Sequence, residues 1–289
     1  MNLNLFTLKQ KQNIELGIFH TEKLTNIVKE ALDIVELEEK YKRHYIIVGP
    51  TGVGKSHTIY NTADIYDIPL KKIISATSMS ALTISLACAV YRANGNQIYV
   101  WVDDCSSLFE NKDSMAVVKN ALDMDKNIFA WNKNMTSKIQ MHENSRNERD
   151  HFIAEALRAY QTVDGVGIEI PVDNVSFIIT TNHPLTSPHP EPTTPRGKDE
   201  AAIQDRVVYT EFDMSRDLAW GWTAAVILSN KNIFNLNKSQ KYILLNWMDN
   251  NWDRLRSVSM RAVGDLAQDM INNPKNYPDH WNMKLKKIK

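Results

Sequence analysis

The chain has 289 residues, of which 43% are hydrophobic and 24% charged, as in an ordinary globular protein with a sizeable core. Lysine plus arginine equals aspartate plus glutamate, 34 of each, so no global basic field draws the chain to nucleic acid. The two cysteines, Cys88 and Cys105, lack metal-ligand spacing, which argues against a disulfide scaffold and for a reducing compartment.

The N-terminal segment "MNLNLFTLKQKQ" lacks the charged-then-apolar order of a signal peptide. A helix is predicted after it, over residues 21–43. The longest apolar run, "ALTISLACAVY", is too short to cross a bilayer. We therefore expect a cytoplasmic protein without a membrane partner.

The stretch "IIVGPTGVGKSHTIY", residues 46–60, places Gly49, Gly54, Lys55 and Ser56 at the spacing of a phosphate-binding loop. The apolar "RHYIIV" before it is predicted as a buried strand, and a helix is predicted over 55–64. Backbone N–H groups and the start of that helix would attract phosphate. The pattern predicts ATP and Mg²⁺ as cofactors, with Lys55 at the β- and γ-phosphates and Ser56 on the metal. The expected nucleotide-binding residues are Gly49, Pro50, Thr51, Gly52, Val53, Gly54, Lys55, Ser56 and His57.

Apolar runs and helical segments alternate from residue 44 to 213, which predicts an α/β domain with a parallel sheet flanked by helices. Strands are expected at "HYIIVG", "KKIISAT", "QIYVWVDD", "NVSFIITTN" and "RVVYTEFD", with helices over 79–93, 112–123 and 148–161. The proline-rich segment 183–200 cannot be a regular element. After Asp213 the apolar residues follow helical spacing only, so we expect two domains, 1–213 and a small all-α domain 214–289 with the Lys-rich tail "KLKKIK".

Polar residues follow two of these strands. Asp103 and Asp104 end "QIYVWVDD", a form in which one acid binds Mg²⁺ and the second acts on the attacking water. Asn182 ends "VSFIITTN" and could orient water. Arg206 stands at a helix-to-strand junction, and Arg261 near the start of a later helix. Each of these also has a plain interpretation, as a turn residue or a solvated charge.

In this order the motifs resemble those of the AAA+ ATPases over residues 20–272. The resemblance implies a five-stranded parallel sheet in the order 5-1-4-3-2 with a helical lid, working as a ring or helical homo-oligomer, commonly a hexamer. Asp103 and Asp104 would be the Walker B acids and Asn182 the sensor 1 residue. Arg206 would be the arginine finger acting on a neighbouring subunit, with Arg196 as runner-up, and Arg261 the sensor 2 residue. The family usually has glutamate where this chain has Asp104, so hydrolysis could be slow.

Residues 124–175 form an insertion before Asn182. Asp164-Gly165 between β-prone residues predicts a hairpin there, similar to the hairpin that some AAA+ proteins place in a central pore. Lys133 and Lys138, near Trp131, are candidate nucleic-acid contacts, because single strands need positive charge and stacking surfaces. A hairpin that packs on its own domain and a solvated, mixed-charge face are equally open.

Three functions fit these patterns. The first is an ATPase that remodels DNA, a helicase, helicase loader or related motor of a phage-like replication system, which would act in the host cytoplasm. The second is a protein-remodelling or assembly-switch ATPase of the MoxR type with a protein partner. The third is a superfamily 3 viral helicase, ranked lower because that family lacks the sizeable helical lid.

Overall fold

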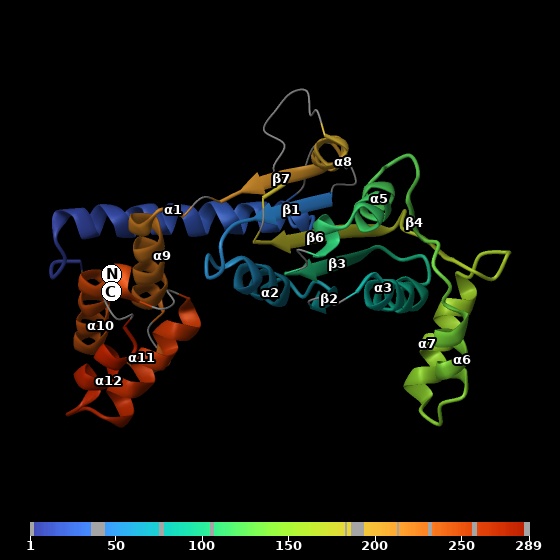
Figure 1. Ribbon diagram of the computed structural model, residues 1–289. Coiled ribbons are helices and arrows are strands. Elements are labelled where there is room, and N and C mark those ends of the chain that lie inside the picture. The colour runs from blue at the N-terminus through green and yellow to red at the C-terminus, as the bar shows by residue number, and fades with distance from the viewer. Residues whose placement is uncertain are drawn as a thin grey trace. The chain divides into compact units, whose positions relative to one another are not determined.

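In the computed structural model (Figure 1), the described residues are 3–35, 44–74, 78–104, 107–182, 184–185, 194–212, 214–230, 233–255 and 259–285. They divide into two compact units. The helical unit comprises Met1–Ile27, Pro50–Lys55 and Asp213–Lys289, and the sheet unit comprises Val28–Gly49 and Ser56–Phe212. These units group residues by proximity, and the division into domains 1–213 and 214–289 stays a prediction.

The sheet unit is α/β, as predicted, with a five-stranded sheet whose neighbouring strands all run parallel. Its strands are β1 (His44–Val48), β2 (Leu70–Ile74), β3 (Ile98–Asp103), β6 (Val175–Thr181) and β7 (Val207–Glu211). Every residue of β1 and β6 is buried, because strands in the middle of such a sheet are covered on both faces.

With all strands numbered along the chain, the order in the sheet is β2-β3-β6-β1-β7, which differs from the predicted 5-1-4-3-2. The prediction counted five strands only. Two further strands, β4 (Ile128–Trp131) and β5 (Ile168–Pro171), lie between β3 and β6 in the chain and form a separate two-stranded sheet. They shift the numbering of every strand after β3.

Alternating residues of the strands bury one face of the sheet against α3 (Met79–Ala93) and α5 (Lys112–Ala121). Val100 and Val102 of β3 share this core with Leu86 of α3 and Met115 of α5. Ser78 caps the start of α3 through the N–H of Ala81. The unit also contains α2 (Lys55–Ile65), α4 (Ser107–Glu110) and α8 (Pro195–Gln204).

The turn predicted at Asp164-Gly165 is present, but the strand after it, β5, also pairs with a distant strand that the sequence did not indicate. β5 pairs antiparallel with β4, and the helices α6 (Thr136–Glu143) and α7 (Glu148–Ala159) lie between them in the chain and side by side in Figure 1. Asp164-Gly165 does form a tight turn, but one bridge alone, Gln161 to Ile168, flanks it among the described residues. α7 ends at Ala159, and the residues between it and Asp164 form no strand, although backbone hydrogen bonds join Thr162 to Gly167 and Glu169 to Tyr160.

The helical unit contains α9 (Arg216–Ser229), α10 (Lys238–Asn251), α11 (Met260–Asn272), α12 (Tyr277–Met283) and two short 3₁₀ turns, Ile233–Asn235 and Trp252–Arg254. The first helix, α1 (Leu8–Ala31), starts earlier than the predicted 21–43, whose residues 36–43 lie outside the described ranges. It approaches α9 closely, since a Cβ on Gly221 would lie 1.8 Å from the carbonyl oxygen of Asn13. Of the predicted Lys-rich tail, residues 286–289 also lie outside the described ranges.

No helix among the described residues is long and apolar enough to cross a membrane.

Candidate functional site

The glycine loop, Pro50–Lys55, follows β1 and belongs to the helical unit. Gly52 and Gly54 have φ of +93° and +87°, in the region that favours glycine. A Cβ on Gly54 would lie 2.7 Å from a ring carbon of Trp222, so the close contact also requires glycine. Lys55 is only 7% exposed, and its Nζ donates to the Pro50 carbonyl at 3.1 Å. Packing within the helical unit therefore fixes the shape of this loop.

His20 of α1 also holds the glycine loop. Burial lowers the pKa of His20, while a hydrogen bond with the backbone of Val53 raises it, with a net decrease. A bond that raises the pKa favours the protonated ring, so the ring N–H donates and the Val53 carbonyl accepts. The lowered pKa favours the neutral ring, which donates through a single N–H.

Three polar residues meet at the carboxyl edge of the sheet, where β3 and β6 end. Ser56 and Asp103 were predicted as site residues, and Thr180 was not. Ser56, in the first turn of α2, donates its hydroxyl hydrogen to Asp103 Oδ1 at 2.9 Å. Thr180 of β6 donates to the same oxygen at 2.8 Å. The parallel register brings Thr180 beside Asp103, because Val102 pairs with Ile179. A carboxylate and a hydroxyl are oxygen ligands of the type that Mg²⁺ takes.

Asp104 and Asn182 form a second contact at this edge. The amide nitrogen of Asn182 donates to Asp104 Oδ1 at 2.8 Å. Asp104 directly follows β3 and has φ of +52°, an uncommon value for aspartate, with its side chain hydrogen-bonded to that amide. The predicted base and the predicted water-orienting amide are thus brought together.

The predicted arginines lie elsewhere. Arg206 stands before the first residue of β7, at the amino edge of the sheet. Its Nε and Nη2 donate to Asp123 Oδ2 at 3.1 and 2.9 Å, and its Nη1 donates to the Ala202 carbonyl at 2.6 Å. The Arg206 guanidinium holds the pKa of Asp123 below its usual range. Arg196 pairs with the buried Glu200 at 2.8 Å. Arg261 lies exposed in the first turn of α11.

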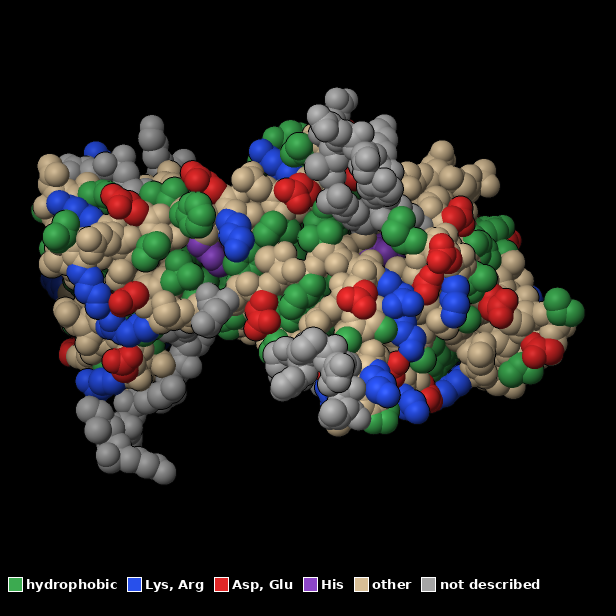
Figure 2. Space-filling model, turned by 90° about the horizontal axis from the view of Figure 1, so that it is seen from above, with side chains coloured by type: hydrophobic (Ala, Val, Ile, Leu, Met, Phe, Trp, Pro, Cys, Tyr) green, Lys and Arg blue, Asp and Glu red, His purple; other side chains and the backbone are tan. Residues whose placement is uncertain are grey.

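The predicted nucleic-acid residues lie in the insertion. Lys133 is exposed, 3.8 Å from Asp113, with its Nζ 5.0 Å from the ring centre of the buried Trp131. Lys138 is half-buried on α6. On the face drawn in Figure 2, Lys and Arg side chains are interspersed with Asp and Glu. Trp131 is therefore a core residue and not a stacking surface.

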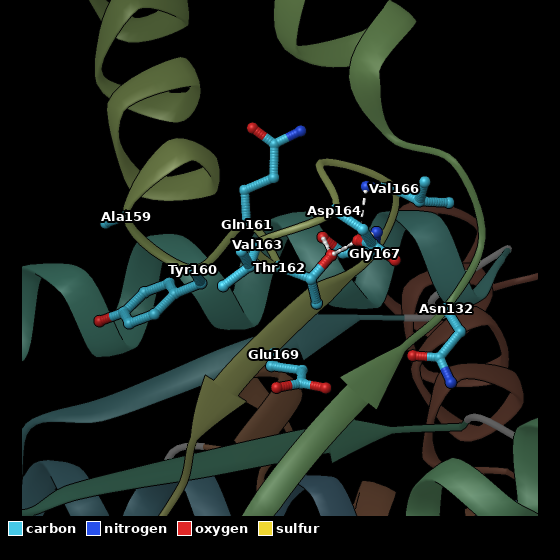
Figure 3. A pocket seen from close by; sticks show the side chains of 10 residues that line it. All are labelled: Asn132, Ala159, Tyr160, Gln161, Thr162, Val163, Asp164, Val166, Gly167 and Glu169. Atoms are coloured by element: carbon cyan, nitrogen blue, oxygen red, sulfur yellow. Dashed lines mark hydrogen bonds between the residues drawn. The ribbon is translucent and has the colours of Figure 1, made fainter.

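A cavity of about 740 Å³ lies beside the turn that precedes β5 (Figure 3). Its charged lining residues are the acids Asp164 and Glu169, and the rest are apolar, amide or hydroxyl residues. The hydroxyl of Thr162 and the N–H of Val166 bind the Asp164 carboxylate and lower its pKa. Sequence reasoning did not foresee this cavity, because it forms where α7 ends against the distant β4–β5 pair.

No protein-family model matches the chain, and no curated protein matches its sequence.

Proposed function

We propose that the protein is a Mg²⁺-dependent ATPase. The observation that carries this is the contact of Ser56 with Asp103, because it joins the residue after a glycine loop to an acid at the end of a parallel strand. Open α/β sheets bind their ligands at the carboxyl ends of the strands.

The chain's own groups fit ATP with Mg²⁺. Ser56 directs its hydroxyl hydrogen to Asp103, which leaves the oxygen lone pairs for a cation. Among the described residues, no group of three or more His, Cys, Asp or Glu side chains could hold a metal. Mg²⁺ in phosphoryl-transfer sites needs only one or two carboxylates, since the substrate phosphates complete its shell. The metal would neutralise charge that develops on the phosphates. Lys55 and the loop N–H groups would bind those phosphates.

Asp104 would accept a proton from the attacking water, and Asn182 would hold that water or Asp104 itself in place. Their contact at 2.8 Å supports a shared role. Arg206 would complete the site of a neighbouring subunit, which makes the working form a homo-oligomer. Arg261 would act on the nucleotide of its own subunit.

The test is direct binding of fluorescent ATP with Mg²⁺ and with EDTA, followed by phosphate release. We expect binding that tightens with Mg²⁺, together with slow turnover. In an Asp103→Asn variant, Mg²⁺ should no longer tighten ATP binding, since an amide is a poorer ligand for a hard cation. Absence of binding at millimolar nucleotide would reject the proposal.

For the coupled function, a DNA-remodelling motor of a phage-like replication system rests on Lys133 and Lys138 in the insertion. Replacing both by alanine should reduce DNA-stimulated turnover and leave basal turnover unchanged. It should also lower the slope of log affinity against log salt by about one unit per lost phosphate contact. Lys198→Ala, an exposed lysine on α8, is the matched control. An unchanged slope would place any DNA elsewhere.

A protein-remodelling or assembly-switch ATPase of the MoxR type is the second candidate. The cavity beside the 162–167 turn favours it, because acids line that cavity and phosphates would be repelled there. A superfamily 3 helicase remains the third. Turnover measured with single-stranded DNA, double-stranded DNA and a cationic peptide separates these candidates: only the second expects the peptide alone to stimulate.

A further inference from the structure

Thr180 and Trp101 lie beneath Asp103 in the sheet unit and are almost fully buried, at 1% and 0% exposure. The indole Nε1 of Trp101 donates to Thr180 Oγ1 at 3.3 Å, and Thr180 Oγ1 donates to Asp103 Oδ1 at 2.8 Å. Both contacts join β3 to β6, which pair directly in the sheet.

The direction of these hydrogen bonds is fixed by chemistry. An indole N–H can only donate, so the Thr180 oxygen must accept from it. Thr180 has one hydroxyl hydrogen, and a carboxylate such as that of Asp103 can only accept. The hydrogen of Thr180 is therefore directed to Asp103, in a bond strengthened by the charge of its acceptor.

We propose that Thr180, oriented by Trp101, is a positioning residue that holds the Asp103 carboxylate in the orientation that binds Mg²⁺. Together with Ser56 it places two hydrogens on one oxygen, which fixes the rotation of the carboxylate about its last bond. Without Thr180 the carboxylate would turn, and part of the metal affinity would go into ordering it again. This inference rests on the proposed ATPase function.

Removal of a residue that orients a metal ligand commonly weakens metal binding about 10- to 100-fold. We therefore expect Thr180→Val, which keeps the branched shape without the hydroxyl, to raise the dissociation constant of the metal at least about tenfold. Thr180→Ser keeps the donor and should stay within about twofold of the unsubstituted protein. Trp101→Phe should weaken metal binding in the same direction, by less.

The measurement is electron paramagnetic resonance of Mn²⁺, titrated into the full chain saturated with a non-hydrolysable ATP analogue. Thr83→Val is the matched control, since Thr83 is also fully buried and its hydroxyl binds only the Met79 carbonyl in α3 among the contacts described. A purely structural role for Thr180 predicts that both valine variants lower the melting temperature and neither changes Mn²⁺ affinity.

That result, or equal Mn²⁺ affinity in Thr180→Val and the unsubstituted chain, overturns the inference. If Thr180→Val does not fold, Trp101→Phe decides, and an unchanged Mn²⁺ affinity in it overturns the inference too. Failure of the unsubstituted protein to bind the analogue contradicts the ATPase proposal itself. If the analogue binds tightly but the complex binds no Mn²⁺, the result contradicts only the metal site, and with it this inference.

Discussion

At the carboxyl edge of the parallel sheet, Thr180 near the end of β6 binds Asp103 at the end of β3. Asn182 and Asp104, which directly follow these two strands, bind each other. At the amino edge, β7 is preceded by Arg206, whose guanidinium is held by Asp123 and the Ala202 carbonyl. The first edge gathers groups that can bind a cation and a water. The second holds a cation by an acid of its own unit.

The comparison constrains what Arg206 can do. A strand of 5 residues spans about 16 Å, at about 3.3 Å per residue. Arg206 stands at one end of such a strand and the carboxyl edge at the other, so its side chain is too short to reach a nucleotide bound at that edge of its own sheet. An arginine finger at this position must act on another subunit, and must leave Asp123 to do so.

The largest effect is expected from Lys55→Ala. Loss of the ammonium group should abolish turnover and weaken ATP binding, since a charged donor to the phosphates is gone. Turnover and fluorescent ATP binding measure the two effects, with Lys198→Ala as control. Because Lys55 is buried and holds the Pro50 carbonyl, an unchanged melting temperature must accompany the result. Normal turnover in Lys55→Ala would show that phosphates bind elsewhere.

The next effect tests the amino edge. If Arg206 is a finger in trans, Arg206→Ala should reduce turnover on the order of 10³-fold while ATP still binds. Subunits carrying Lys55→Ala and subunits carrying Arg206→Ala, each inactive alone, are then mixed. Interfaces that pair an intact Lys55 with an intact Arg206 should restore part of the activity.

A lack of recovery, with mixing of subunits confirmed by labelled protein, would limit Arg206 to its ion pair with Asp123. Arg196→Ala in the same mixing test would then examine the runner-up. Arg196 pairs with a buried carboxylate, so its variant needs the same check of folding.

A smaller effect is expected at Asp104 and Asn182. Asp104→Asn should bind ATP normally and lose turnover on the order of 10²-fold, since an amide cannot accept a proton from water. Asn182→Ala should behave similarly because it removes the donor to Asp104. Rapid-quench turnover and ATP affinity measure both variants. Equal loss of ATP binding in Asp104→Asn would assign that residue to the metal or the fold.

Local pattern carried the prediction furthest at the carboxyl edge. Ser56, Asp103 and Asn182 come after buried apolar runs in the sequence. To predict that they lie near one another, it was enough that parallel strands end at the same edge of a sheet. Thr180 was missed because a threonine inside "FIITTN" looks like any β-branched strand residue. Its place beside Asp103 follows from the β3–β6 register, which joins segments 77 residues apart.

Long-range pairing also explains the failures. Nothing in the sequence indicated the partner of Arg206, because Asp123 lies 83 residues away along the chain. Similarly, the Asp164-Gly165 turn signal indicated the bend and the short pairing of its adjacent segments, but not that β5 also pairs with β4 across two helices. Turn chemistry specifies a bend, and the burial of Phe129, Trp131, Ile168 and Ile170 in the common core selects the partner strand.

The smallest expected effect is the pH dependence of the Arg206–Asp123 pair. Since hydrogen bonds from Arg206 lower the pKa of Asp123 in the folded chain, the pair stabilises the protein above the unfolded pKa of about 4. That stabilisation is lost as the pH falls through the lowered folded pKa. Urea midpoints of the unsubstituted protein and Asp123→Asn should therefore differ by a constant amount from pH 7 to about pH 5. They should begin to converge near the unfolded pKa of about 4, and meet only below the lowered folded pKa. A difference that persists in acid would trace to the packing of the Asp123 side chain. Asp123→Asn also tests the contrast between the two edges. If Arg206 is a finger in trans, the variant releases its guanidinium and should keep turnover at or above that of the unsubstituted protein. If the ion pair is only structural, the variant should lose stability alone.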